Sequence, residues 1–192
     1  MSGRELSKAI NEKLQVVSAV FSEFQNTTGL LCPKECGRCC FKSDISCSPY
    51  ELLPMSYDLI DKGRGEEVLL KAKTYSGKAC IFLEIIDEQS GTGRCSEYQY
   101  RPFICRAFGI SARRGKYGQI EKSICKTLAE VQKMDSKINY ADTEIPSIDL
   151  WKKNLESLDP NLLNVEVPIN EGLVIILEKL LLIKSLSEEI IP

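Results

Sequence analysis

The chain has 192 residues, of which 43% are hydrophobic, so it can build a core without relying on covalent cross-links. Its formal net charge is −2, which gives no overall attraction to nucleic acid or to an anionic membrane. It contains nine cysteines and no histidine, which excludes imidazole-ligated zinc sites and both Ser-His-Asp and Cys-His catalytic arrangements.

An amphipathic helix is predicted over residues 4–26. Apolar residues recur there at steps of three and four from Leu6 to Phe24, and Gly29 provides a stop signal. This spacing is typical of a helix that packs one face against a core.

No segment carries the signature of membrane insertion. The N-terminal residues lack the apolar region of a signal peptide, and the apolar stretch that begins at Gly172 is interrupted by Glu178 and Lys179. We therefore expect a cytoplasmic protein with no membrane partner. In a reducing compartment, clustered cysteines are more often metal ligands or catalytic groups than disulfides.

Two further helices are predicted in the next segment. Ser48 has the features of an N-cap, with Pro49 at the first helical position and Glu51 completing a capping box. Gly63 ends this helix, and residues 65–75 form a shorter one.

A β-hairpin is predicted at the centre of the chain. The stretch ACIFLEII is apolar and β-branched, as in a strand, and a turn-rich connector leads to a returning segment that begins at Cys95. We predict a basic loop over 111–119, then a helix from about Lys122 that includes Cys125, and an apolar helix over 171–186. These elements predict a mainly α (α+β) fold, with helices around a small cysteine-rich core.

Four cysteines lie within the nine residues CPKECGRCC, which span 32–40. Gaps of two and three residues let consecutive sulfurs converge on one metal ion. Gly37 frees the backbone to turn its amide groups toward the sulfurs. We therefore predict a site with sulfur ligands that takes zinc, or iron that could be held as an iron–sulfur cluster.

Eight thiols are enough for two four-sulfur sites. Cys39 and Cys40 point in different directions in most backbone conformations, so we predict that they serve different sites, or that one of them packs or reacts instead. Cys47 is predicted to be a small buried hydrophobe. The eight predicted ligands are Cys32, Cys36, Cys39, Cys40, Cys80, Cys95, Cys105 and Cys125.

The cysteine run also has the C-x3-C-x2-C spacing that holds the cluster in radical-SAM enzymes. In those enzymes the motif follows the first strand of a barrel, whereas here it follows a helix. The chain is also short for that barrel, so this interpretation is less favoured.

The run CPKECGRCC is followed by SPYEL, CIFL, CSEYQYRPFICRAFG and a late cysteine. In this order the motifs resemble the CxxCxxCC family of cysteine-cluster proteins, also known as YkgJ-like or zinc- or iron-chelating domains. The resemblance includes a Tyr-x-x-Arg-Pro-x-x-Cys-Arg segment and covers about Cys32 to Cys125. That segment consists of Tyr98, Arg101, Pro102, Cys105 and Arg106.

The resemblance implies a chelating module of bacterial type, with the same eight cysteines as candidate ligands. It implies no particular reaction, although a related cysteine cluster accompanies flagellin lysine methylation in some bacterial proteins. We expect an N-terminal helix over 1–30, a cysteine-cluster domain over 31–135 and a C-terminal helical extension over 136–192, all in one globular unit.

Two arginines are predicted to support the metal site. Pro102 gives Cys105 a rigid approach, and Arg101 and Arg106 would offset the negative charge of a thiolate-rich site. Between Glu97 and Glu121 there are five basic residues and no acidic ones, with aromatic residues interleaved. Such a segment is also compatible with a nucleic-acid surface, but the acidic composition disfavours that interpretation.

Three functions are compatible with these patterns. The favoured one is a metal-binding protein whose zinc or iron is structural, carried or sensed. The alternatives are an enzyme that uses an iron–sulfur cluster for redox chemistry or protein modification, and a nucleic-acid-binding module with zinc as its scaffold. The C-terminal helix is predicted to close the core and is a candidate interface for a second copy or another protein.

Overall fold

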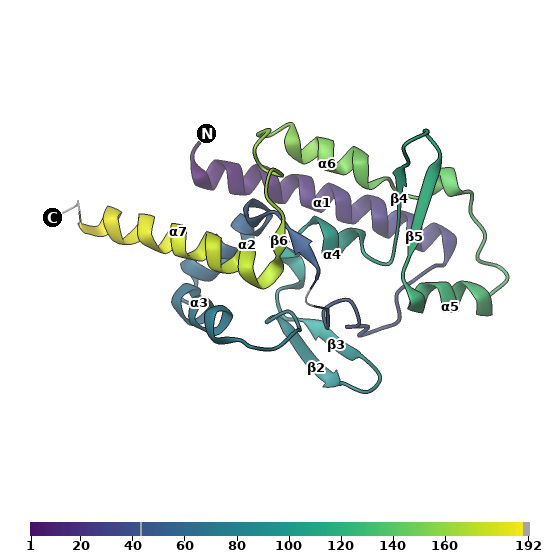
Figure 1. Cartoon of the computed structure of the whole chain (residues 1–192), viewed down its shortest axis with the longest axis horizontal. Coiled ribbons are helices and arrows are strands. Elements are labelled where there is room, and N and C mark those ends of the chain that lie inside the picture. The colour runs from purple at the N-terminus through teal and green to yellow at the C-terminus, as the bar shows by residue number, and fades with distance from the viewer. Residues whose placement is uncertain (43, 190–192) are drawn as a thin grey trace.

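The computed structural model describes residues 1–42 and 44–189 (Figure 1). It is 52% helical, and the described residues form seven α-helices and three two-stranded antiparallel sheets. The predicted mainly α (α+β) class is confirmed. Among the described helices, none combines the length and the apolar character needed to cross a membrane.

The α-helices follow one another along most of the chain, and the strands pair as short ribbons between them. The helices are α1 (Gly3–Thr28), α2 (Leu53–Asp61), α3 (Gly65–Thr74), α4 (Phe103–Ala107), α5 (Lys126–Met134), α6 (Ile148–Glu156) and α7 (Ile169–Glu189). The strands are β1 (Ser46–Cys47) with β6 (Val167–Pro168), β2 (Leu83–Asp87) with β3 (Thr92–Cys95), and β4 (Ile110–Arg114) with β5 (Ile120–Ile124). Three short 3-10 helices are η1 (Pro49–Leu52), η2 (Tyr98–Tyr100) and η3 (Asp142–Glu144).

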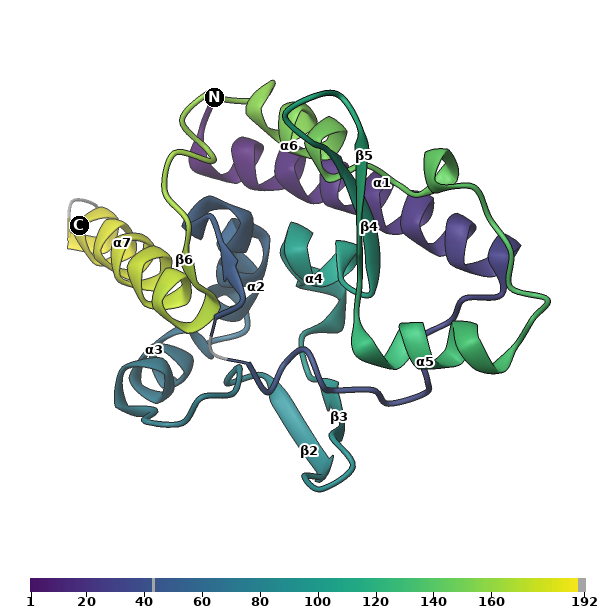
Figure 2. The same cartoon turned by 45° about the vertical axis from the view of Figure 1, so that its right-hand side comes forward.

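The helix α1 confirms the predicted N-terminal helix and extends slightly beyond it at both ends. A capping box begins it, because the Ser2 hydroxyl accepts from the Glu5 amide and the Glu5 carboxylate accepts from the Ser2 amide. Gly29 ends it in the left-handed conformation, with φ 73°. Its buried face packs against α2, α4 and α6 (Figures 1 and 2). The most buried residues of that face are Ile10, Leu14, Val17 and Phe21.

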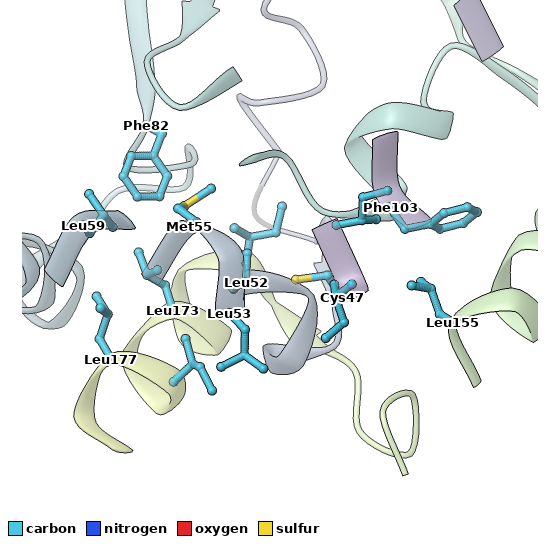
Figure 3. Packing of buried hydrophobic residues seen from close by; sticks show 14 of the residues in the cluster. Cys47, Leu52, Leu53, Met55, Leu59, Phe82, Phe103, Leu155, Leu173 and Leu177 are labelled. Carbon is cyan, nitrogen blue, oxygen red and sulfur yellow. The ribbon is translucent and has the colours of Figure 1, made fainter. Parts of the chain in front are cut away.

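The main core lies between α1, α2 and α7. In Figure 3, Leu52 and Leu59 lie beside Leu173 and Leu177 of α7, and all four side chains are fully buried. Burial of one such leucine contributes about 1.5–3 kcal/mol to folding. Cys47 belongs to this core with 2% of its surface exposed, so its prediction as a small buried hydrophobe is confirmed.

The capping box predicted at Ser48 is present, and Gly63 ends the following helix with φ 71°. The first turn of that segment is the 3-10 helix η1, and α2 continues from it. The predicted helix over 65–75 is confirmed as α3.

The predicted strand over 79–86 is only partly correct. Strand β2 begins at Leu83, and the residues before it form a turn in which the Leu83 amide donates to the Cys80 carbonyl at 3.0 Å. Ile81 and Phe82 are apolar because they enter the main core, with 4% and 5% of their surfaces exposed. Burial in the core, rather than sheet pairing, therefore explains the apolar start of this stretch.

The basic loop predicted over 111–119 is only partly correct, and the helix predicted from about Lys122 begins at Lys126, as α5. The region forms the hairpin β4–β5, in which Ile110 pairs with Ile124 and Arg113 with Glu121. Gly118 turns the chain with φ 83°. Cys125 lies at the N-cap of α5 rather than inside a helix. A strand stabilised by its partner leaves only a weak pattern in its own sequence, which explains the error.

Candidate metal centre

A cavity of about 290 Å³ lies where the cysteine run, the β2–β3 hairpin, α4 and the start of α7 meet. Met55, Phe82 and Ile169 form a buried apolar part of its wall. Five of the eight predicted ligands line it, and all five are partly buried. These residues are Cys39, Cys40, Cys80, Cys95 and Cys105. The fold therefore brings together thiols that lie far apart in the sequence.

The thiols line one cavity but do not form a complete coordination sphere for a metal ion. Within the described part of the chain, no three Cys, Asp or Glu side chains converge closely enough to hold an ion as they stand. The Sγ atoms of Cys39 and Cys40 are 3.9 Å apart. Sulfurs of a tetrahedral zinc site, with Zn–S bonds of about 2.3 Å, lie about 3.8 Å from each other. The separation of this pair therefore matches that of two ligands of one ion.

The cysteine run is held by the β2–β3 hairpin. The Gly37 amide donates to the Gly91 carbonyl at 3.1 Å, and the Gly93 amide donates to the Glu35 carbonyl at 2.8 Å. A Cβ atom on Gly37 would lie 3.1 Å from the Gly93 Cα atom. Gly37 is therefore needed for close approach to β3, not for the backbone freedom that was predicted, since its φ is not positive.

Two turns set the direction of the run. The Cys36 amide donates to the Pro33 carbonyl at 3.1 Å, and the Cys40 amide donates to the Gly37 carbonyl at 2.8 Å. Glu35 has a positive φ of 57°, which is uncommon for a residue with a side chain. The chain thus reverses twice within the run and delivers Cys39 and Cys40 to the cavity.

Cys105 reaches the cavity through the Arg-Pro turn. Its amide donates to the Pro102 carbonyl at 3.1 Å, and the Arg101 guanidinium donates to the Cys105 carbonyl at 3.1 Å. Arg101 also lies over the Tyr98 ring at 3.5 Å and lines the cavity. The Arg101 guanidinium therefore lies beside the thiols. Within the described residues, its hydrogen bonds go to backbone carbonyls and not to a carboxylate.

Arg106 occupies a different position. It is buried and donates to the Arg101 and Gln99 carbonyls, both at 2.6 Å, and to the Ser18 hydroxyl at 2.5 Å. Burial and the nearby Arg101 charge lower the pKa of Arg106 to about 10. Its hydrogen bonds hold the Arg-Pro turn against α1.

Three predicted ligands lie outside the lining of the cavity. Cys125 caps α5, since its sulfur accepts from the Leu128 amide at 3.4 Å, and its own amide donates to the Gly109 carbonyl at 2.8 Å. A Cβ atom on Gly109 would lie 3.7 Å from the Cys32 sulfur, so Cys32 and Cys125 flank the same glycine. Cys36 is paired with Thr92 of the hairpin in an isolated antiparallel β-bridge.

Residues 31–135, more than half of the chain, match the CxxCxxCC family, which is described as a "putative zinc- or iron-chelating domain". The chain belongs to the CxxCxxCC family. The predicted resemblance is thereby confirmed, together with a chelating character for zinc or iron in general terms. No curated protein and no solved structure matches the chain significantly.

The thiols of the CxxCxxCC domain differ in their acidity. Burial raises the pKa of Cys80 to about 11 and also raises the pKa values of Cys95 and Cys105. The hydrogen bond between the Cys39 and Cys40 sulfurs lowers the pKa of Cys39 to about 7 and raises the pKa of Cys40. At neutral pH an incoming ion therefore meets one thiol that is readily ionised among several that are protonated.

Asn170 was missed by the sequence analysis. It lies in the first turn of α7, outside the CxxCxxCC domain, and lines the cavity. Its side chain is hydrogen-bonded to the backbone on both sides of Cys80. Local sequence carries no signal for this residue, because an asparagine at a helix start is usually a cap.

Proposed function

We propose that the protein binds zinc or iron through the thiols of its cavity, and that the metal is structural, carried or sensed. The observation that carries this proposal is the convergence of five cysteines from separate segments on one cavity. Thiolates favour zinc and iron–sulfur centres over hard cations such as magnesium. The membership of the CxxCxxCC family supports the same function.

Arg101 supports the metal in this proposal. Four thiolates around a divalent ion leave a net charge of about −2, which a nearby cation offsets. The Arg101 charge acts on Cys39, Cys95 and Cys105 in the direction that favours the thiolates. We assign to Arg106 the role of holding the turn that presents Arg101 and Cys105, because its hydrogen bonds go to that turn.

The second candidate is an iron–sulfur protein, with redox chemistry or protein modification as its activity. The observation that favours it is the cavity volume of about 290 Å³, which exceeds what one ion needs. A cluster held by four of the five thiols would use more of this space.

A nucleic-acid-binding function has less support. Of the basic residues between Glu97 and Glu121, Arg101 lines the cavity, Arg106 is buried, and Arg113 pairs with Glu121 at 2.8 Å. The charges of these three residues are thus engaged elsewhere, which weakens the support for an electrostatic footprint of the kind that nucleic acid requires.

We propose a cytoplasmic location, because a reducing compartment keeps clustered cysteines as thiols that can bind a metal. We also propose that the segments 1–30, 31–135 and 136–192 form one globular unit. Leu14 of α1 and Leu173 of α7 pack in the same core, which supports that arrangement.

Metal analysis with absorption spectroscopy on anaerobically purified protein tests the function. We expect bound zinc with a colourless protein, or iron with the broad visible absorption of a cluster. Cys105→Ser should lower the metal content, whereas Cys47→Ala, which removes a core thiol that does not line the cavity, should retain it. Wild-type protein that holds no metal after reconstitution with zinc, or with ferrous iron and sulfide, would rule out the proposal.

A further inference from the structure

We propose that Asn170 is a positioning residue of the metal centre, and that the C-terminal extension thereby completes a site whose cysteines lie in the CxxCxxCC domain. This inference rests on the proposed metal-binding function. Asn170 lies at the start of α7, beyond the matched residues 31–135.

The Asn170 side chain brackets Cys80. Its Oδ1 atom accepts from the Ile81 amide at 3.1 Å, and its Nδ2 group donates to the Ala79 carbonyl at 3.0 Å. A primary amide can make both bonds because it has a donor and an acceptor side by side. The residues on either side of Cys80 are thus held by one side chain.

Two other contacts hold the same turn from different directions. The Cys80 amide donates to the Cys40 carbonyl at 2.8 Å, and the Lys71 ammonium donates to the Ile81 carbonyl at 2.8 Å. The first ties the turn to the cysteine run and the second ties it to α3. The Cys40 carbonyl and the Lys71 ammonium each make one bond to this turn, whereas the Asn170 side chain bonds to the residues on both sides of Cys80.

The segment that carries Asn170 is held in place by hydrogen bonding and by packing against the core. The Ile169 amide donates to the Ile45 carbonyl at 3.1 Å, next to the β1–β6 pair. A Cβ atom on Gly172 would lie 3.2 Å from Leu52 Cδ1, so the first turn of α7 packs closely on η1. Leu173 then enters the core. The amide group therefore projects from a rigid element, as a positioning residue must.

The start of α7 also forms one side of the cavity. The cavity is lined there by Ile169, Asn170 and Glu171 of α7, and by Pro168 of β6 just before it. Because Cys80 and α7 are connected through the Asn170 amide, a metal bound by Cys80 stabilises the docking of α7. By linkage, a docked α7 strengthens metal binding to the same extent. A purely structural asparagine would affect stability but leave the metal affinity of the folded protein unchanged.

The test compares three variants of the full chain by competition for zinc with a chromophoric chelator. Asn170→Ala removes both hydrogen bonds and should weaken zinc binding about 10- to 100-fold, the range typical of residues that orient metal ligands. Asn170→Asp keeps an acceptor for the Ile81 amide but sets a carboxylate oxygen against the Ala79 carbonyl, and should also weaken zinc binding. The control Asn164→Ala removes an exposed asparagine whose side chain donates only within its own turn, and should match wild type.

Thiol alkylation read by mass spectrometry provides a second measurement on the metal-free proteins. In Asn170→Ala, alkylation at Cys80 should accelerate while that at Cys125 stays unchanged, because Cys125 caps α5 and does not line the cavity. Wild-type zinc affinity in folded Asn170→Ala would overturn the positioning role, whatever the reactivity of Cys80. Absence of zinc binding in the wild type would instead overturn the proposed function.

Hydrogen exchange on the wild-type protein covers the case in which Asn170→Ala does not fold. Removal of zinc should speed exchange at the Ile81 amide, which donates to Asn170, and in the first turn of α7. Equal protection at both places with and without zinc would contradict the coupling between Cys80 and α7.

Discussion

At the scale of single residues, the candidate centre depends on thiols with unequal acidity in one cavity. The hydrogen bond with Cys40 lowers the pKa of Cys39 to about 7, whereas burial raises the pKa of Cys80 to about 11. Arg101 lies beside them and favours the ionised forms of Cys39 and Cys105. This pattern suits an initial contact at Cys39, followed by deprotonation of the more buried thiols as they bind.

Zinc binding should therefore release protons at pH 7. The raised pKa of Cys80 means that this thiol is protonated there before binding, as is Cys105, while Cys39 is partly ionised. We expect about three to four protons per zinc bound by four thiols. The apparent affinity should rise with pH, because binding removes protons. Calorimetry in buffers of different ionisation enthalpy measures the number, and a value near zero would exclude these thiols as ligands.

Cys39 and Cys40 should belong to one metal site. Their sulfurs lie 3.9 Å apart, close to the separation in a four-thiolate zinc site. We expect Cys39→Ser and Cys40→Ser each to lose the same equivalent of zinc, with Cys47→Ala as the control. Loss of different equivalents by the two variants, resolved by metal analysis of the single and double variants, would instead support the two separate sites that the sequence suggested.

At the scale of elements, a small hairpin holds the cysteine run. The backbone groups of Glu35 and Gly37 bond to the β2–β3 hairpin, which also carries Cys95 into the cavity. Two glycines, Gly37 and Gly93, face each other where the run and the hairpin touch. The hairpin projects from the helical body (Figures 1 and 2). Its backbone hydrogen bonds to Glu35 and Gly37 therefore help to fix the position of the cysteine run.

Gly93→Ala should destabilise the protein by about 1–3 kcal/mol, the range for overpacking. The new Cβ atom would lie 2.8 Å from the Glu84 carbonyl oxygen, which cannot move without disturbing β2. Gly115→Ala is the matched control, since its Cβ atom would meet only the flexible ends of Gln119 and Glu121. Urea denaturation of both variants measures the difference, and equal stabilities would refute the close packing at Gly93.

At the scale of the whole molecule, the CxxCxxCC domain shares its core with the segments on either side. Leu14 and Val17 of α1 and Leu173 and Leu177 of α7 pack with Leu52 in the main core. All four flanking side chains are at most 1% exposed. The matched domain by itself would expose the surfaces that these residues cover.

The fragment 31–135 should consequently fail to fold stably, even with zinc present. It would lose the apolar contacts of α1 and α7, each buried leucine being worth about 1.5–3 kcal/mol, and the Asn170 bonds to the Cys80 turn. Circular dichroism and thermal melting of the fragment against the full chain test this. A fragment that melts cooperatively near the temperature of the full chain would show that the flanking segments are dispensable.

The elements whose signals are local were predicted correctly. The caps at Ser48 and Gly63 and the apolar spacing of α1 act within a few residues, so they can be read directly from the sequence. The hairpin β4–β5 was missed because a strand is stabilised by its partner. Its polar strand β5, which contains Glu121 and Lys122, has no apolar run that would reveal it.

The family, the sulfur chemistry of the candidate ligands and the helical class could all be predicted from the sequence, because residue type and short-range spacing set these properties. Only the tertiary structure decided that Cys80 and Cys105 join Cys39 in one cavity, while Cys32 and Cys125 lie beside Gly109. It also decided that Asn170 holds the Cys80 turn. These contacts join residues far apart in the chain, and the packing of α7 and the hairpin, rather than any local pattern, sets the distances between them.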